Sequence, residues 1–291
     1  MPTPDAAEFD RWYDVLERSP QWRRFVGEQL GLPEQMFATG FLSGEGLAEI
    51  QSLLSLRLDD TLVELGCGRG GYGLSLIGGV GARLVGVDFS SVALRGAEAD
   101  AVAYGLADRT TFQLGDLTTT GLPDESASAV VCVDAIQFAA SVPDALTESL
   151  RILRPSGQLV ITTWQASTPA DGVPERIRRL DLAHDFAVAG FDNVEVLTRP
   201  AWSATERRLW TAALDLDPGE DDALDALRDE AADLLPLADS LHRVVAIGRR
   251  PGNPWPGVAR SFSLNERSGS WGAAGLPAHI PRVVPRAGDS L

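Results

Sequence analysis

The stretch Glu64-Leu-Gly-Cys-Gly-Arg-Gly-Gly has the clearest chemical pattern in the chain. Its glycines fit the G-x-G-x-x-G pattern of a dinucleotide-binding turn, where the N-terminus of a helix faces a pyrophosphate. They also fit a G-x-G-x-G pattern preceded by an acid. A charged Glu64 would repel a pyrophosphate and would suit a ligand that carries an ammonium or sulfonium group. The glycines by themselves leave both interpretations open.

Acidic residues also end the apolar runs that follow. Asp88 closes RLVGVD about 20 residues after Gly68, and an acid at that distance accepts both hydroxyls of a ribose in either kind of site. Asp116 closes TFQLGD and could bind an adenine amino group, while Leu117 could donate its backbone N–H. Acids at the ends of several strands indicate a ligand crevice along one edge of the sheet.

The elements that must position these residues are short apolar runs alternating with helical stretches. Strands are expected over 61–65, 83–88, 111–116, 129–134, 158–164, 193–198 and 242–248. Helices are expected over 5–30, 43–56, 90–105, 142–153, 174–191, 203–214 and 221–235. This alternation predicts βαβ units and a parallel sheet covered on both faces, with an antiparallel pair at the end. Ser43 is expected to cap its helix, and Ser203 with Glu206 fits a capping box.

The chain of 291 residues is long enough for one α/β domain with extra segments. Residues 1–57 are expected to form an N-terminal helical cap. Residues 58–250 are expected to form the ligand-binding domain, in which 199–240 is a helical insertion. Residues 251–291 are rich in Pro, Gly and Ser and are expected to form a poorly ordered tail.

The composition excludes several classes of function. The formal net charge of −16 argues against a nucleic-acid surface, and the basic clusters RIRR, ERR and GRRP are expected to be solvated helix faces. All 25 basic residues other than histidine are arginine, so a Schiff base, pyridoxal phosphate attachment and a P-loop are excluded. Two cysteines and three scattered histidines do not make a zinc site, and we expect no metal. No apolar run reaches the ~20 residues of a membrane span, and the acidic N-terminus is unlike a signal peptide, which predicts a cytoplasmic protein.

Five motifs between residues 61 and 164 together resemble those of class I S-adenosylmethionine-dependent methyltransferases. In order they are VELGCGRGG, GVDFS, LGDL, VVCVDAIQF and ILRPSGQLVITTW. The first three are also similar to bacterial small-molecule and natural-product methyltransferases. The resemblance implies a Rossmann-like, seven-stranded, mostly parallel sheet whose last strand is antiparallel, with helices on both faces, an N-terminal cap and an insertion before the last strand. It also implies S-adenosylmethionine as the cofactor.

The resemblance further implies a set of cofactor-binding residues. Backbone of the glycine turn would contact the methionine moiety, with Glu64 toward its ammonium group, and Asp88 would hold the ribose. Phe89 would cover the adenine, and Asp134 would present its backbone near the methionine amine. The full expected set is Glu64, Gly66, Cys67, Gly68, Asp88, Phe89, Ser90, Asp116, Leu117 and Asp134. Ser90 is also expected to cap the helix that it precedes.

Residues for catalysis and for the acceptor are harder to assign. The catalytic candidates are His184, Gln137 and Asp134, although Gln137 could orient an acceptor but not act as a base, and the neighbours of His184 favour an ordinary helix-face histidine. An aromatic acceptor pocket could be lined by Trp12, Tyr13, Trp22 and Trp164, with Gln137. The same tryptophans could equally be packing residues of the cap.

Three functions remain open from the sequence. The favoured one is methyl transfer to a small-molecule acceptor, O- or N-directed, with a role in specialised metabolism. The others are a non-catalytic S-adenosylmethionine-binding module and an NAD-linked oxidoreductase, which Glu64 and the missing lysine argue against. We expect a small-molecule acceptor as partner, no nucleic acid, no membrane, and a monomer or homodimer. 

Overall fold

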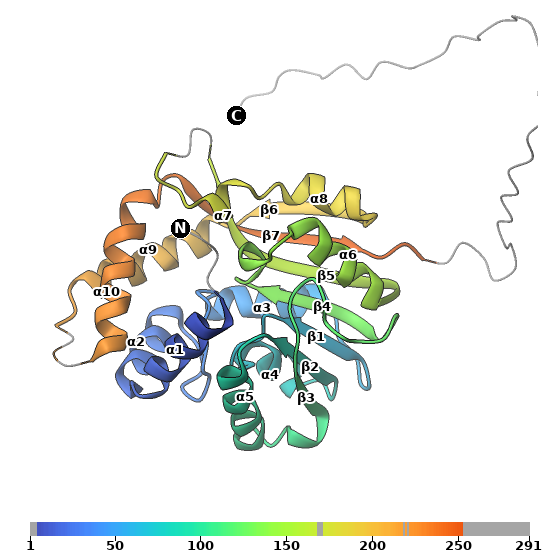
Figure 1. Ribbon diagram of the computed structural model, residues 1–291, viewed down its shortest axis with the longest axis horizontal. Coiled ribbons are helices and arrows are strands. Elements are labelled where there is room, and N and C mark those ends of the chain that lie inside the picture. The colour runs from blue at the N-terminus through green and yellow to red at the C-terminus, as the bar shows by residue number, and fades with distance from the viewer. Residues whose placement is uncertain (1–4, 168–170, 218, 220, 253–291) are drawn as a thin grey trace, which may run out of the picture. The chain divides into compact units, whose positions relative to one another are not determined.

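A single seven-stranded sheet organises the chain (Figure 1). The computed structural model describes residues 5–167, 171–217, 219 and 221–252, which belong to one compact unit. The strand order is β3-β2-β1-β4-β5-β7-β6. The strands are β1 (Thr61–Leu65), β2 (Arg83–Asp88), β3 (Thr110–Leu114), β4 (Ala127–Val133), β5 (Leu153–Ala166), β6 (Asp192–Thr198) and β7 (Leu241–Arg249).

The direction of the strands confirms the expected mostly parallel sheet. β1, β2, β3, β4 and β5 pair in parallel, and β7 lies antiparallel between β5 and β6. The chain leaves β1 toward β2 on one side and later returns to β4 on the other. Such a reversal of strand order opens a crevice at the carboxyl ends of the strands, which is where ligands bind in folds of this type.

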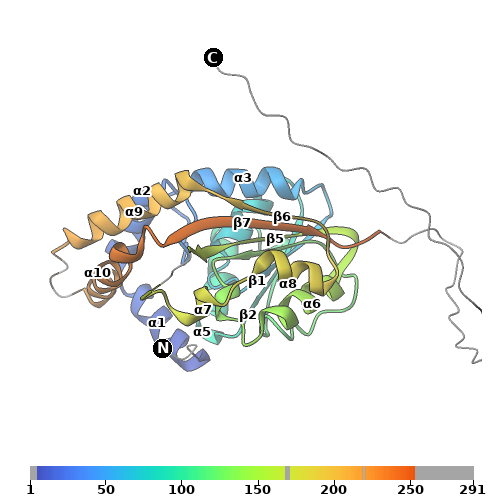
Figure 2. The same cartoon turned by 90° about the horizontal axis from the view of Figure 1, so that it is seen from above.

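Helices cover both faces of the sheet, as Figure 2 shows from above. Leu62, Leu84 and Val131 face a core that includes α3 (Gly44–Leu54) and α4 (Gly71–Gly78), beside α5 (Ser91–Ala103). Val63 and Val130 face the opposite core, formed with α6 (Val142–Ile152) and α8 (Leu182–Ala189). Neighbouring strand residues point to opposite faces, so apolar residues along β1 and β4 serve two cores at once.

Two segments far apart in the chain share a third core. α1 (Ala6–Glu17) and α2 (Pro20–Leu30) pack against α9 (Pro200–Leu214) and α10 (Asp222–Leu234), which follow β6 and precede β7 in the sequence. Trp22 and Trp210 are almost fully buried in this core. Ser19, which caps α2, also donates its hydroxyl hydrogen to Asp221, which caps α10, across 2.6 Å. We call these four helices the helical cap.

Three expected helices differ from the observed ones. The stretch 5–30 forms α1 and α2, because Ser19 caps a second helix that begins at Pro20. The stretch 174–191 forms two helices, α7 (Glu175–Arg178) and α8, because the Asp181 side chain accepts from the His184 N–H and starts a new helix. The capping box at Ser203 is wrong, because α9 already begins at Pro200, whose missing N–H suits the first helical position. Ser43 and Ser90 cap their helices as expected.

Three short 3₁₀ segments complete the described elements: η1 (Ala107–Arg109), η2 (Ile136–Phe138) and η3 (Leu235–Leu237). Within the described ranges, no helix has the length and apolar character needed to cross a membrane. Of the expected tail, all residues after 252 lie outside the described part of the chain.

Candidate active site

The glycine turn after β1 adopts a backbone that other residues rarely take. Gly66, Gly68 and Gly70 have φ of 65°, 52° and 70°, in the left-handed region. A Cβ atom added to Gly68 would lie 2.4 Å from the hydroxyl oxygen of Tyr13 on α1. The N–H groups of Gly66 and Cys67 both donate to the carbonyl of Val87. The turn is therefore held against the end of β2, and at Gly68 there is no room for a side chain beside Tyr13 of α1.

Asp88 fixes the turn from the neighbouring strand. Its carboxylate accepts from the Gly68 N–H at 2.8 Å and from the Ser90 N–H at 2.8 Å, and the residue is 4% exposed. Burial raises the pKa of Asp88, while the backbone hydrogen bonds oppose that rise. An acid at the end of β2 therefore lies beside the glycine turn, as expected from the sequence.

Glu64 lies under the start of α4 rather than at the surface. Its Oε2 atom accepts from the Gly73 N–H at 3.1 Å, and the residue is only 1% exposed. Burial raises the pKa of Glu64 to about 8, and the charge of Asp88 adds to the rise. Burial thus favours the protonated form of this carboxyl. A cation nearby would lower that pKa.

Helix α1 covers the same edge of the sheet. The ring centroid of Phe9 lies 5.2 Å from that of Phe89 and 5.3 Å from that of Phe138 in η2. Asp10 on the same helix accepts from the Ser90 hydroxyl at 2.5 Å. Phe9 and Asp10 were not predicted from the sequence, because nothing in their local pattern separates them from other helix residues.

Asp134, at the end of β4, is engaged on every side. Its carboxylate accepts two hydrogen bonds from Arg243, at 2.7 and 3.0 Å, one from the Phe41 N–H at 2.8 Å, and one from the Thr162 hydroxyl at 2.7 Å. Its backbone carbonyl accepts from Gln137 Nε2 at 2.6 Å. These contacts argue against Asp134 as a free base.

Gln137 is equally engaged. The residue is 2% exposed, and its Oε1 atom accepts from the Thr163 hydroxyl at 2.9 Å. With its amide nitrogen bonded to Asp134, both ends of the side chain are satisfied inside the protein. This arrangement argues against the expected role of Gln137 in orienting an acceptor.

A buried charged cluster extends from Asp134 into the helical cap. Arg243 on β7 is 1% exposed, also contacts Glu206 Oε2 at 3.2 Å, and lies over the Trp164 ring at 4.4 Å. Trp164 is its partner across the β5–β7 pair. Glu206 also accepts from the indole N–H groups of Trp164, at 2.8 Å, and Trp210, at 3.2 Å. We call Asp134, Trp164, Glu206, Trp210 and Arg243 the Arg243 cluster.

The Arg243 cluster borders a cavity of about 20 Å³, which is room for one water molecule. Burial raises the pKa of Glu206, although Arg243 opposes this. Two acids and one arginine give the cluster a net negative charge when both acids are ionised. In the sequence, Glu206 belongs to the predicted capping box and Arg243 to the predicted strand 242–248, and neither assignment indicates a buried ion pair.

The other expected site residues have differing surroundings. Trp22 belongs to the core of the helical cap, whereas Trp12 lies at the edge of that core and also packs with Phe9 and Tyr13. His184 is exposed on α8, and no hydrogen bond of its imidazole is present among the described residues. Asp116 is exposed, and its Oδ1 atom accepts from Thr118 and Thr119, which closes a tight turn. Leu117 packs toward Gly66, at the expected edge.

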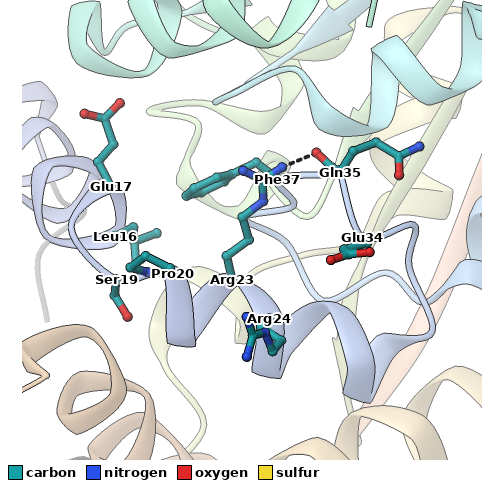
Figure 3. A pocket seen from close by; sticks show the side chains of 9 residues that line it. All are labelled: Leu16, Glu17, Ser19, Pro20, Arg23, Arg24, Glu34, Gln35 and Phe37. Carbon is teal, nitrogen blue, oxygen red and sulfur yellow. Dashed lines mark hydrogen bonds between the residues drawn. The ribbon is translucent and has the colours of Figure 1, made fainter. Parts of the chain in front are cut away.

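A separate recess of about 500 Å³ lies at the junction of α1 and α2 (Figure 3). It is lined by Leu16, Glu17, Ser19, Pro20, Arg23, Arg24, Glu34, Gln35 and Phe37. Arg23 spans it by donating to the carbonyl of Gln35. None of the residues expected to bind cofactor or acceptor lines this recess, so it does not belong to the site at the sheet edge.

The residues at the carboxyl edge fit S-adenosylmethionine. The left-handed glycines let backbone approach the ligand, and each would bring a Cβ atom into a neighbouring group. Asp88 and Glu64 supply acids for hydroxyl and cationic groups, and Phe89 and Phe138 supply apolar rings. This combination of backbone, acids and rings suits a cationic ligand with an adenosine half.

Comparisons with known proteins agree with this fit. The family model described as "Methyltransferase domain" matches residues 63–161. A probable S-adenosylmethionine-dependent methyltransferase of Mycolicibacterium smegmatis is 28% identical over 258 residues, which cover 76% of this chain and 97% of that protein. Sterol 24-C-methyltransferase ERG6B of Gibberella zeae is 28% identical over 123 residues, 42% of this chain and 32% of that enzyme. The chain thus spans about a third of the length of such sterol methyltransferases.

Solved structures show the same fold. The [4+2]-cyclase SpnF superposes with a TM-score of 0.67 and 20% identity, over 87% of this chain and 99% of that one. Phosphoethanolamine N-methyltransferase 2 of Haemonchus contortus, in complex with S-adenosyl-L-methionine, has a TM-score of 0.67 and 18% identity, over 83% and 60%. Residues 63–161 therefore match the methyltransferase domain family, and the solved structures show that the chain has the fold of these proteins.

Proposed function

We propose that the protein transfers a methyl group from S-adenosylmethionine to a small-molecule acceptor, at an oxygen or a nitrogen atom. The observation that carries the proposal is the arrangement at the ends of β1 and β2. Asp88 holds the Gly68 N–H at 2.8 Å, and Glu64 lies buried under the next helix. The bound cofactor would supply an electrophilic methyl group on a sulfonium.

The chain's own contribution is to bind, orient and exclude water. The glycine turn and Asp88 would hold the methionine and ribose portions, and Phe89 would cover the adenine. α1 lies over the edge through Phe9 and Tyr13, which keeps water from the turn. Positioning an acceptor atom in line with the methyl group can lower the barrier by roughly 7–11 kcal/mol.

A small acceptor is supported by the names of the relatives. The proteins similar to this chain include enzymes named for sterols, tocopherol and phosphoethanolamine. The fold does not fix the reaction, since the [4+2]-cyclase SpnF shares it. A role in the specialised metabolism of a bacterium is part of the same proposal.

The proposal is tested first by calorimetry with S-adenosylmethionine, S-adenosylhomocysteine and NAD⁺ on the full chain. We expect binding of the first two and none of NAD⁺. Tight binding of NAD⁺ without either of the others would overturn the proposal.

Methyl transfer itself is tested by release of S-adenosylhomocysteine with a panel of small acceptors. We expect turnover with at least one small alcohol, phenol or amine above the rate without acceptor. Binding of the cofactor with only slow hydrolysis across the panel would instead favour a non-catalytic binding module.

A further inference from the structure

Arg176, in the short helix α7, differs from the other arginines of the described structure. It is half-buried, and its Nε atom is buried without a hydrogen-bond partner. Its guanidinium carbon lies 5.5 Å from the centre of the Phe138 ring. Burial lowers the pKa of Arg176, which means that the surroundings do not compensate its charge.

Three other arginines also have a buried Nε atom without a partner, but each has partners for its remaining nitrogens. Arg69 contacts Glu17 at 2.8 Å and Asp100 at 3.1 Å, while Arg243 contacts Asp134 and Glu206. Arg23 donates to the Gln35 carbonyl. Arg176 has neither an ion pair nor a hydrogen bond with any described residue.

The negative charge that acts on Arg176 comes from Glu230 on α10. The charge of Glu230 raises the pKa of Arg176 and so partly opposes the effect of burial. Glu230 is exposed, yet the surrounding protein raises its pKa to about 7, with the charge of Glu206 adding to that rise. Each of the two charges shifts the pKa of the other, so α7 and α10 place a cation and an acid in the same region.

That region adjoins the candidate active site. Phe138, under Arg176, follows β4 directly and contacts Phe9, which contacts Phe89 beside Asp88. The next residue of α7, Ile177, packs in a cluster with Trp164 of the Arg243 cluster. We call the glycine turn with Glu64, Asp88 and Phe89 the cofactor edge. Through Phe138 and Ile177, Arg176 lies between this edge and the Arg243 cluster.

Burying a guanidinium away from water without a paired acid costs free energy. An anion that accepts its hydrogen bonds offsets this cost. Its planar fork matches the geometry of a carboxylate or phosphate group. We propose that Arg176 binds an anionic group, a carboxylate or a phosphate, on the acceptor that this protein methylates. The inference rests on the proposed function for the identity of the ligand as the acceptor.

The test is a titration of the full chain with sodium phosphate and sodium acetate, each with and without saturating S-adenosylhomocysteine. Sodium chloride at equal ionic strength controls for screening, and binding is followed by calorimetry and by the shift of the melting temperature. The variants are Arg176→Met and Arg176→Lys. Arg178→Met is the matched control, because Arg178 is exposed on the same helix and pairs with Glu175.

We expect wild type and Arg178→Met to bind phosphate or acetate more tightly than chloride, and the stronger of the two identifies the anionic group. Arg176→Met should weaken that binding about tenfold or more, with Arg176→Lys in between. Equal binding by wild type and Arg176→Met, or none by wild type with or without S-adenosylhomocysteine, would overturn the assignment.

Once an acceptor is known, a kinetic comparison provides a second measurement. Arg176→Met should raise KM for the anionic acceptor about tenfold with kcat within twofold, and Arg176→Lys should recover part of the loss. Unchanged KM would count against the assignment. Failure of S-adenosylhomocysteine to bind would instead overturn the proposed function. The two failures can be told apart, because the anion titration without S-adenosylhomocysteine tests Arg176 by itself.

Discussion

The cofactor edge and the Arg243 cluster both bury acids, but they stabilise them in different ways. At the cofactor edge, Asp88 and Glu64 accept hydrogen bonds from backbone N–H groups that are 20 and 9 positions away in the sequence. In the Arg243 cluster, Asp134 is held by an arginine 109 positions away. The first region is built by local chain geometry, and the second only by the assembled fold. Buried acids are therefore stabilised by backbone N–H groups in the first region and by a buried arginine in the second.

The largest expected effect is the loss of Arg243. Arg243→Met leaves Asp134 and Glu206 buried without their cation, so the free energy of unfolding should fall by about 3–5 kcal/mol. Urea denaturation measures this, with Arg249→Met, on the exposed end of the same strand, as the control. Removing both acids as well, by Asp134→Asn and Glu206→Gln, should recover part of the loss. A loss below about 1 kcal/mol in Arg243→Met would show that the cluster does not need its cation.

Glu64 gives the cofactor edge a pH dependence. Its pKa is about 8 in the folded protein against an ordinary value of 4.5, so the folded state holds a proton that the unfolded state releases between these values. The stability from this proton is fully present below pH 4.5 and is lost as the pH rises through about 8. Wild type should therefore lose on the order of 3 kcal/mol more than Glu64→Gln between pH 5 and pH 8. Parallel stability curves for the two proteins would contradict this.

Asp88 should matter more for the cofactor than for the fold. Asp88→Ala removes a carboxylate expected to bind the ribose and frees the Gly68 N–H, so affinity for S-adenosylmethionine should fall roughly 10- to 100-fold. Calorimetry measures it, with Asp108→Ala, an exposed acid in η1, as the control. Affinity unchanged within threefold would remove Asp88 from the cofactor site.

The smallest expected effect is at His184, outside both regions. Because its side chain is exposed on α8, His184→Ala should change stability by less than about 0.5 kcal/mol and kcat by no more than about twofold. Steady-state kinetics with an accepted substrate measures it. A drop in kcat beyond ~100-fold with intact cofactor binding would assign His184 to the reaction after all.

The fold was predictable where the signal is local. β1 and β2 begin and end at the expected residues, because buried parallel strands leave short apolar runs between turn residues. The expected helix over 174–191 is two helices because Asp181 caps the second, and the start of α9 follows Pro200 rather than Ser203. In both cases competing local signals were present, and the cap at Asp181 and the start at Pro200 set the observed boundaries.

The candidate site was predictable only at the cofactor edge. The glycine turn and Asp88 lie together as expected, since both stand at adjacent strand ends. The residues expected to bind the acceptor were not predictable. Trp22 lies in the core of the helical cap, and both ends of the Gln137 side chain are hydrogen-bonded inside the protein. Glu206 was expected in a capping box, but it accepts from Trp164 instead. Arg176 was expected on a solvated helix face, whereas its Nε is buried.

The sequence by itself determined the sheet, the glycine turn and the acids beside it, because strand periodicity and left-handed glycines act over a few residues. Only the tertiary structure decided that α1 and α2 join α9 and α10 in one cap, and that Arg243 lies between Asp134 and Glu206. Burial depends on which distant segments pack together. Burial in turn shifts the pKa of a carboxyl and determines whether a guanidinium requires a paired anion.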